Sequence, residues 1–439
     1  MKHSPNTPIL LTSSLHVDDA RKAIANLVKE LIHESLAIND SADIETLPLD
    51  QSINRVLAQD LLSPIDVPAA DNSAMDGYAF NGQCLSKGDE QITLKIVGTA
   101  LAGKPYEGKI GPGECLKIMT GALMPADCDT VIPQEFTLSN NNELVQFKSD
   151  QLKAGENRRL RGEDLQKGKA AICAGRILRP SDLGLAASLG VSSLPVRRKL
   201  KVAILSSGDE LRSLGQTLDV GGIYDSNRYS LYGLLKRLDL DIIDCGIVKD
   251  DPATLRQAFI EAASKADVLI SSGGVSVGEA DFTKQIMQEL GDVGFWKIAM
   301  RPGRPMAFGI LKAVPGKLPA RKTLFFGLPG NPVAVMVTFY QFVRQALLSL
   351  MGQPSPTVLP MLSAICVSPI RKLKGRTEFQ RGILFLADNG TWQVKTTGNQ
   401  SSGVLSSMSQ GNCFIVLGEE VGNIEAGETV QVQLFDGVI

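Results

Sequence analysis

Apolar residues recur at three- and four-residue steps soon after the start of the chain. From about Val17 this spacing predicts an amphipathic helix, whose inner face would carry Ala20, Ala23, Ile24, Leu27, Val28, Leu31 and Ile32. A second helical segment is expected to begin near Leu49 and to run through Leu57. Because proline restricts the backbone, Pro64 and Pro68 are expected to end regular structure. The chain is therefore predicted to open with two helices.

Short β-rich segments replace the helical pattern between residues 91 and 149. They include QITLKIVG, ECLKIMTG and DTVIPQE, and Gly, Pro and Asn separate them, as in turns. We interpret this region as a small all-β domain inserted into the first domain. The stretch PSDLGLAASLG that follows it is expected to form a helix that returns to the first domain.

Apolar segments alternate with helical ones from Lys199 to about Gly352. KVAILSSGDE, DIIDCGIVKDD and DVLISSGG each precede a helical pattern, such as SNRYSLYGLLKRL after the first of them. This alternation predicts a mostly parallel sheet with helices on both faces. From about Gln353 the pattern alternates with period two again, in TWQVKTT and ETVQVQLF, and predicts a small sheet or barrel of about 80 residues.

Composition excludes several classes of protein. The 439 residues suggest about three domains. Lys and Arg number 45 against 47 Asp and Glu, a net charge of −2, which disfavours general binding to nucleic acid or to anionic membranes. The three histidines all lie near the N-terminus, which disfavours a Ser-His-Asp triad or a His-ligated zinc. Seven dispersed cysteines without a CxxC, no signal peptide and no run of eighteen apolar residues indicate a cytoplasmic protein without a membrane segment.

Three strand ends of the α/β region carry loops rich in Gly and Ser. They are SSGDE (206–210), SSGGVSVGEAD (271–281) and GLPGNP (327–332). In an open parallel sheet, ligands bind at the carboxyl ends of the strands, and glycines let backbone amides approach an anion. No loop has the Lys-Ser/Thr of a Walker A motif, and no GxGxxG opens a helix. The three loops together favour an anion-binding crevice of another kind.

Acidic residues gather in the same region: Asp209, Glu210, Asp225, Asp250, Asp251, Glu279 and Asp281. For each of them, a role limited to solvation or helix capping is possible. Capping is the better interpretation of Asp250 and Asp251, which precede Pro252. A carboxylate about 4 Å from a phosphate would repel it by about 4 kcal/mol at an effective dielectric near 20. The acids therefore predict a bridging cation, for which Mg²⁺ is suited. Lys297 and Arg301, and more weakly Arg304, add positive charge.

Three polar motifs lie outside the α/β region. DNSAMDGYA (71–79) follows a proline-rich entry, IMTGA (118–122) ends a β segment, and RRLRGED (158–164) mixes arginines with acids. For the first motif, loop capping by Asp71 or Asp76 and a functional role stay open. The third motif alone would be a surface ion-pair cluster.

In order and spacing, the motifs together resemble the molybdopterin molybdenumtransferase family, the MoeA-type molybdenum insertases. DNSAMDGYA, IMTGA, RGED, SSGDE, YDSNR, DDP, SSGGVSVGEAD, FWK-x3-RPGRP and GLPGNPV carry the resemblance, which extends from about residue 17 to 439. EFQRG, TTGNQSSG and GNCFIVL continue it in the tail. Any one string is weak, whereas the ordered set is very specific.

The resemblance implies a homodimer of four-domain subunits. A discontinuous linker and dimerisation domain would cover 17–62 and 158–196, with an inserted small β domain over 63–157. A molybdopterin-binding three-layer α/β domain would cover 197–352, and a C-terminal β-barrel-like domain 353–439. The implied reaction inserts molybdate into adenylylated molybdopterin and releases AMP and molybdenum cofactor, with Mg²⁺ required. Molybdopterin adenylyltransferase and downstream cofactor-modifying enzymes would be transient partners.

Residue by residue, the resemblance implies three groups of site residues. The catalytic positions would be Asp76, Thr120, Asp164, Glu210, Asp250, Asp281, Lys297 and Arg301. The positions that bind the pterin substrate would be Ser207, Gly208, Ser272, Gly273, Gly274, Pro329, Gly330, Asn331 and Pro332. Glu210 and Asp281 would hold Mg²⁺, and Asp76 and Thr120 would act across the dimer. Several family members carry Lys where Arg301 stands, so a role specific to lysine is not transferred.

Three other functions are compatible with parts of the sequence. Single-domain molybdopterin adenylyltransferases share the α/β fold, but the extra domains with DNSAMDGYA and IMTGA favour the insertase. A nucleotide-processing hydrolase built on the same domain would not be expected to carry the DNSAMDGYA domain. An interaction scaffold is conceivable because gephyrin, which clusters receptors, contains an insertase-like domain. Against a scaffold, the sequence shows no long disordered linker and no second α/β domain.

Overall fold

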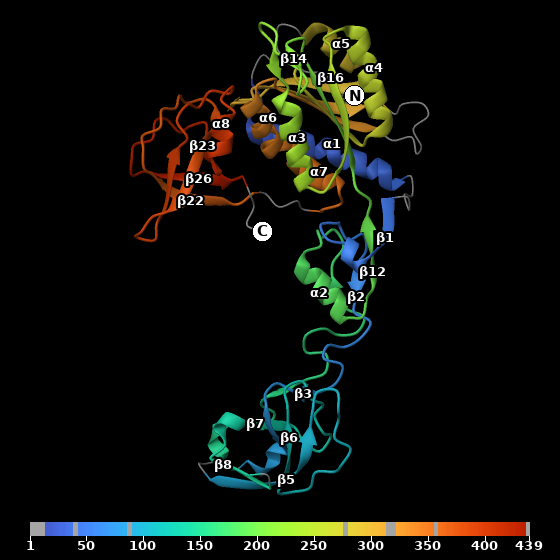
Figure 1. Ribbon diagram of the computed structural model, residues 1–439, viewed down its shortest axis with the longest axis vertical. Helices are drawn as coiled ribbons and strands as arrows, with labels where there is room; N and C mark the ends of the chain where they lie inside the picture. Colours follow the sequence, from blue (N-terminus) through green and yellow to red (C-terminus); the bar gives the residue numbers. More distant parts are fainter. Residues whose placement is uncertain are drawn as a thin grey trace, which may run out of the picture. The chain divides into compact units, whose positions relative to one another are not determined.

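The structure is a computed structural model that describes residues 14–37, 43–85, 90–141, 143–274, 280–312, 322–354 and 359–435 (Figure 1). It comprises two compact units. Unit 1 contains Met1–Leu47, Ser52–Ala58 and Pro195–Ile439, and unit 2 contains Pro48–Gln51 and Gln59–Leu194. Unit 2 is therefore inserted into the sequence of unit 1.

The α/β part of unit 1 has a six-stranded sheet in the order β16-β13-β17-β21-β20-β18. The strands are β13 (Lys201–Ser207), β16 (Asp241–Val248), β17 (Val268–Ser272), β18 (Gly291–Lys297), β20 (Pro305–Leu311) and β21 (Thr323–Leu328). The first four in sheet order are parallel, and β20 is antiparallel to both β21 and β18. β18 therefore runs in the same direction as β21. The predicted mostly parallel sheet is confirmed.

Helices cover both faces of this sheet (Figure 1). Their bounds are α1 (Val17–Ala37), α3 (Ser226–Arg237), α4 (Pro252–Lys265), α5 (Ala280–Leu290), α6 (Pro332–Thr338) and α7 (Arg344–Leu350). α4 and α5 pack together over one core, and α3 contacts α6 while α1 contacts α7. The three-layer arrangement and the helix predicted from Val17 are both confirmed.

One continuous helix in this part has the composition of a membrane span. Pro332–Leu350 joins α6, the π-helix η6 (Phe339–Val343) and α7, and it is long and apolar enough to cross a membrane. Because 72% of it is buried inside the protein, it reads as a core helix.

The C-terminal part of unit 1 is a closed barrel. Its strands are β22 (Met361–Cys366), β23 (Thr377–Leu386), β24 (Trp392–Thr396), β25 (Cys413–Leu417) and β26 (Thr429–Leu434), with the short helix α8 (Ser406–Gln410) before β25. The ring runs β23-β24-β22-β26-β25 and closes through a β23–β25 pairing around a buried apolar core. Strand β19 (Met300–Arg301) pairs with β23 and so joins the α/β part to the barrel. The predicted barrel is confirmed.

The main sheet of unit 2 has the order β7-β4-β6-β5-β9-β8. Its strands are β4 (Gly77–Phe80), β5 (Gln91–Ala100), β6 (Glu114–Ile118), β7 (Thr130–Pro133), β8 (Ser139–Asn140) and β9 (Leu144–Lys148). Short ones are β2 (Leu61–Leu62), β3 (Asn72–Ser73), β10 (Arg158–Arg159) and β11 (Ala170–Ile172). Helix α2 (Pro180–Ser188) confirms the expectation for PSDLGLAASLG, and the all-β prediction for 91–149 is also confirmed.

The predicted helix from Leu49 to Leu57 is wrong. Only Leu49–Gln51 forms a single 3-10 turn, η2. Asn54 then takes a left-handed conformation with φ 62°, which interrupts a right-handed helix. Leu57 is fully buried and forms a bridge with Val196. Tertiary contacts therefore override the local helical spacing.

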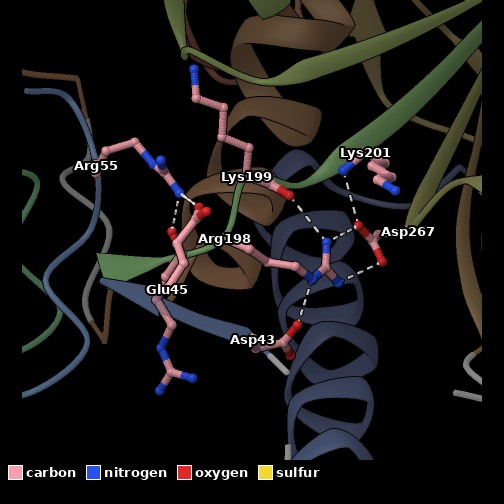
Figure 2. A network of polar contacts seen from close by, with 8 residues as sticks. Asp43, Glu45, Arg55, Arg198, Lys199, Lys201 and Asp267 are labelled. Atoms are coloured by element: carbon pink, nitrogen blue, oxygen red, sulfur yellow. Dashed lines mark hydrogen bonds and ion pairs between the residues drawn. The ribbon is translucent and has the colours of Figure 1, made fainter. Parts of the chain in front are cut away.

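A two-stranded ribbon carries the chain between the units. β1 (Ile44–Pro48) pairs with β12 (Ser193–Arg197). Backbone hydrogen bonds join Arg198 to Asp43 and Leu49 to Ser192, so the strands run antiparallel. At the unit 1 end, the Arg198 guanidinium bonds the carboxylates of Asp43 and Asp267 (Figure 2). These ion pairs attach both strands of the ribbon, next to Asp43 and Arg198, to the α/β part.

Candidate functional site

The glycine-containing loops after β13, β17 and β21 lie side by side at one edge of the α/β sheet. The Gly273 amide donates to the carbonyl oxygen of Leu328 at 3.2 Å. Gly273 has φ 90°, and a Cβ there would lie 2.3 Å from the Ser207 carbonyl oxygen. Only glycine allows this approach of two backbones. The predicted loop residues Ser207, Ser272 and Gly273 are therefore together.

The third loop leads directly into helix α6. Pro329 is buried, whereas Gly330 and Asn331 are exposed at the crevice. Asn331 is the N-cap of α6 and Pro332 is its first residue, a position that proline favours. Gly330 lies against Gly273, since a Cβ at Gly330 would be 4.0 Å from the Gly273 Cα. All of the predicted pterin-binding loops thus share one edge with a helix N-terminus.

Carboxylates border the same loops. The Ser207 hydroxyl donates to the carboxylate of Asp250, and the Asp250 amide donates to Asp209 Oδ1 at 3.4 Å. Glu210 folds back over Gly208, where a Cβ would meet Glu210 Oε2 at 2.7 Å. The capping interpretation of Asp250 is wrong, because its carboxylate accepts a hydrogen bond from the neighbouring loop instead.

Two other acids of this region do cap helices. Asp251 is the N-cap of α4 and accepts from the Thr254 amide at 2.9 Å. Asp225 is the N-cap of α3, where it accepts from the Arg228 amide. Helix capping explains why both carboxylates are present, so no role in ligand binding has to be assigned to either.

The proposed magnesium ligands are only partly described. The backbone of Asp281 lies in the first turn of α5, but its side chain and the whole of Glu279 lie outside the described residues. Within the described ranges, no three His, Cys, Asp or Glu side chains gather as a metal site would require. Glu210, which is exposed, is the candidate metal ligand that the structure does describe.

Lys297 lies at the same edge of the sheet as the loops. It ends β18, which runs in the direction of β21 and is separated from it by β20 alone. Strands are about 4.8 Å apart, so the β18 end is about 10 Å from the β21 end. The Lys297 side chain is exposed, and its carbonyl accepts from the Leu15 amide at 2.7 Å. Lys297 can therefore place positive charge beside the crevice.

Arg301 belongs to a second, cationic pocket. This pocket of about 240 Å³ lies between the 301–302 segment and the barrel, and Arg301, Pro302, Arg371, Glu378, Arg381 and Gln400 are among its lining residues. The Arg301 side chain is 62% exposed, and its Nη1 is 3.8 Å from Glu378 Oε1. Because only three residues separate Lys297 from Arg301, one short segment extends from the edge of the sheet to this pocket.

Arg381 is the functional candidate that the sequence did not single out. It is 1% exposed. Its guanidinium donates to neutral oxygens, Ser407 Oγ at 3.0 Å and the Ser401 carbonyl at 3.1 Å. Burial, and secondarily the charge of Arg301, lowers the pKa of Arg381 to about 10. The guanidinium thus stays cationic at neutral pH. A bound oxyanion would stabilise this charge. The EFQRG string was the available signal.

In unit 2, Asp76 and Thr120 form a direct pair. The Thr120 amide and hydroxyl both donate to Asp76 Oδ1, at 2.7 and 2.8 Å. These bonds, from the amide first and then the hydroxyl, lower the pKa of Asp76. The Asp76 carboxylate is therefore held ionised, with its orientation fixed by two donors to one oxygen.

The remaining predicted residue of unit 2 is Asp164. Its side chain is exposed and its amide donates to the Val67 carbonyl at 3.0 Å. Nearby, Arg161 pairs with Asp66 at 2.6 Å and Arg158 with Asp71 at 3.5 Å. The arginines of the RRLRGED segment therefore do form ion pairs, but with Asp66 and Asp71, which lie outside the segment.

The crevice, the α/β sheet and the barrel define a protein of the molybdopterin-binding class. A family model described as a probable molybdopterin binding domain matches residues 203–349. Models for the MoeA N-terminal region (domain I and II) and the MoeA C-terminal region (domain IV) match residues 15–190 and 363–435. The chain belongs to the MoeA family.

Relatives with curated names and solved structures agree with this family. The molybdopterin molybdenumtransferase of Haemophilus influenzae is 43% identical over 395 residues, covering 90% of this chain and 95% of that protein. That of Nostoc sp. is 34% identical over 438 residues, covering 98% and 97%. The crystal structure of the molybdopterin biosynthesis MoeA protein of Pyrococcus horikoshii has a TM-score of 0.77 at 26% identity, covering 96% of this chain and all of that chain.

Proposed function

We propose that this protein is a molybdopterin molybdenumtransferase, which inserts molybdate into adenylylated molybdopterin and releases AMP. The observation that carries the proposal is the crevice where the Ser207, Gly273 and Gly330 loops converge beside the Asp250 and Glu210 carboxylates. Such a crevice suits a phosphorylated ligand. The names of the full-length relatives above support the same reaction.

The glycine loops would bind the phosphates of the substrate. The Gly273 amide already donates to Leu328 and the Val333 amide of α6 to Ser402. The amides of Gly274, Gly330 and Asn331 would therefore be the donors, without a bulky side chain in the way. Metal insertion into a dithiolene that is already formed needs no protein nucleophile, which agrees with the absence of histidine beyond residue 33. Positioning and charge neutralisation would supply most of the rate enhancement.

Magnesium is the cation that we assign to the acids of the crevice. Mg²⁺ is commonly held by one or two carboxylates together with substrate phosphates, so a cluster of three protein ligands is not required. Glu210 and Asp281 would hold the ion, which when bound would neutralise charge on the bridging phosphates. Lys297 would add positive charge at the same edge. The Asp250 carboxylate, which accepts from the Ser207 hydroxyl, would fix the position of that side chain at the edge of the crevice.

The pocket formed by Arg301 and Arg381 would receive molybdate. Molybdate is a small tetrahedral dianion, and a buried guanidinium paired with neutral oxygens retains unbalanced positive charge. The 297–301 segment connects this pocket to the crevice within four residues. Arg301 could thus attract the anion while Lys297 stabilises charge where the anhydride breaks.

Unit 2 would complete the site of a partner subunit in a homodimer. Asp76, held ionised by Thr120, and Asp164 would act there. The enzyme would be cytoplasmic and would meet molybdopterin adenylyltransferase and downstream cofactor-modifying enzymes transiently, without nucleic acid or membrane.

The direct test is AMP release from adenylylated molybdopterin, with and without molybdate and Mg²⁺. Release that depends on both, with active cofactor formed, is expected. Synthesis of the adenylylated species from ATP and molybdopterin would instead indicate an adenylyltransferase. A folded dimer with neither activity would favour an interaction scaffold, which peptide-binding assays would then examine.

The metal role has a separate test. Asp281→Asn is expected to lower AMP release by about tenfold or more without changing the thermal unfolding temperature. Turnover close to wild type at limiting Mg²⁺ would exclude Asp281 as a metal ligand. Titrating Mg²⁺ in both proteins distinguishes a weaker metal affinity from a slower chemical step.

A further inference from the structure

Asn227 joins two loops of the crevice through one side chain. It is the second residue of α3, and its Nδ2 donates to Ser272 Oγ at 2.8 Å and to the Gly330 carbonyl oxygen at 2.6 Å. Ser272 ends β17, and Gly330 lies in the loop after β21. The carboxamide therefore bridges two neighbouring strands of the sheet at the edge where the phosphates are expected.

The orientation of this amide is fixed by its partners. A carbonyl oxygen can only accept, so the nitrogen must face Gly330. The amide oxygen Oδ1 is left buried without a hydrogen-bond partner. A buried acceptor without a partner is destabilising. The loss of stability from this unpaired oxygen suggests that Asn227 serves to position the loops and not only to stabilise the fold.

The helix that presents Asn227 is itself anchored firmly. The N-cap Asp225 is 1% exposed and accepts from the Ser206 hydroxyl at 3.0 Å and from Arg228 Nε at 2.9 Å. Arg228 also pairs with Asp244 on β16. The first turn of α3 is thus tied to two strands of the same sheet, which gives Asn227 a fixed base.

We propose that Asn227 is a positioning residue that holds the Ser272–Gly274 and Gly330 loops at the separation needed to bind the substrate phosphates. Glycine offers little resistance to backbone rotation, and Gly273 and Gly274 both have positive φ, 90° and 68°. The hydrogen bond from the Gly273 amide to Leu328 joins the two loops once, and Asn227 joins them a second time through the Ser272 hydroxyl and the Gly330 carbonyl. The inference rests on the proposed function, since it assigns the loops to phosphate binding.

The test uses steady-state AMP release by the full-length protein, with Asn227→Ala, the uncharged and similarly sized Asn227→Leu, and Ser272→Ala. Loop amides bind the phosphates equally in the ground state and in the transition state. Their misplacement should therefore weaken both states alike, which raises the KM and leaves kcat nearly unchanged. We expect Asn227→Ala to raise the KM for adenylylated molybdopterin about tenfold, with kcat within about twofold. Ser272→Ala, which removes one of the two bonds, should show a smaller rise.

Ser230→Ala on the same helix is the matched control and should leave both constants unchanged. A merely structural role predicts a lower unfolding temperature and a lower active fraction with the KM unchanged, and that result would overturn the proposal. If Asn227→Ala does not fold, Asn227→Leu replaces it, because an uncharged side chain of similar size cannot donate either bond and adds no charge beside the phosphates. An unchanged KM in Asn227→Leu would equally overturn the proposal.

Failure of the proposed function gives a different result. A wild-type protein that releases no AMP contradicts the insertase, and calorimetric titration with AMP then tests the loops directly. Weaker AMP binding by Asn227→Ala than by wild type would still support the positioning role. Equal affinities of the two proteins for AMP would contradict it.

Discussion

Arg198 and Asp267 form a bidentate ion pair at the unit 1 end of the β1–β12 ribbon. Arg198 Nη1 lies 2.7 Å from Asp267 Oδ2 and Nη2 lies 2.9 Å from Oδ1 (Figure 2). Burial opposes the charged form of Arg198, but the hydrogen bond and charge of Asp267, followed by those of Asp43, hold its pKa above the ordinary value. The two carboxylates thus favour the charged form of the partly buried Arg198 guanidinium.

Loss of this pair should destabilise unit 1. Arg198→Ala leaves Asp267 and Asp43 partly buried without their guanidinium, so we expect unit 1 to lose about 2 kcal/mol of stability. Thermal unfolding followed by calorimetry measures the change. Arg256→Ala is the control, because Arg256 and Glu289 are about half exposed and 3.4 Å apart. An equal effect of both substitutions would contradict a special role for Arg198.

The hydroxyl of Thr120 should set part of the acidity of Asp76. Thr120→Val removes one of the two donors and keeps the amide, so the pKa of Asp76 should rise only part of the way to its ordinary value. A ¹³C NMR titration of the carboxylates measures the shift. Because the folded pKa is lowered, any linked stability is present above the unfolded pKa and is lost as pH falls through the folded one.

Thr254→Val provides an internal comparison for that titration. Thr254 donates its hydroxyl to Asp251 at 2.7 Å and its amide at 2.9 Å, the same arrangement in another unit. This substitution should raise the pKa of Asp251 and leave that of Asp76 unchanged. No movement of the Asp76 pKa in Thr120→Val would contradict the hydrogen-bond explanation.

The cationic pocket should bind molybdate in the absence of the pterin. We expect millimolar molybdate to raise the unfolding temperature of the wild type, and Arg381→Gln to abolish the rise. The effect should weaken as pH approaches the pKa of Arg381, which burial lowers to about 10, because the neutral guanidine would no longer attract the dianion. An Arg256→Gln control should respond as the wild type does. Equal stabilisation of Arg381→Gln would place the anion elsewhere, and a parallel sulfate titration measures selectivity.

Gly273 should tolerate no side chain. A Cβ would lie 2.3 Å from the Ser207 carbonyl oxygen, and φ is 90°. Gly273→Ala should therefore lower stability by about 1–3 kcal/mol and raise the KM for the adenylylated substrate. Gly403→Ala is the matched control, because nothing lies within 4 Å of the Cβ position there. Denaturant unfolding and AMP release measure the two effects, and similar results for both variants would argue against a strained loop.

Much of the fold could be predicted because its signals are periodic and local. The helix from Val17 and the alternating pattern after Lys199 each repeat a spacing that only one regular structure satisfies. The segment after Leu49 misled because Leu57 is buried by a bridge to Val196, a contact almost 140 residues away that local spacing does not encode.

The candidate site divides in the same way. The glycine loops could be located from the sequence because each follows a strand of one parallel sheet. The Arg381 pocket could not, because its wall combines Arg301 with Arg381 of the barrel, and the EFQRG string indicates the family without indicating a pocket. Asn227 was equally hidden, because its two partners, Ser272 and Gly330, lie 45 and 103 residues away.

The insertion of unit 2 also sets an order of events during synthesis. Helix α1 is made before unit 2, yet its Arg21 bonds Gln341, 320 residues later in the chain. Unit 2 can finish folding while the packing partners of α1, η6 and α7, have not yet been synthesised. The exposed apolar face of α1, with Ala20, Ile24 and Val28 that are buried in the finished protein, is then the segment most in need of protection. A nascent chain stalled before residue 332 should consequently recruit a chaperone at its N-terminal helix.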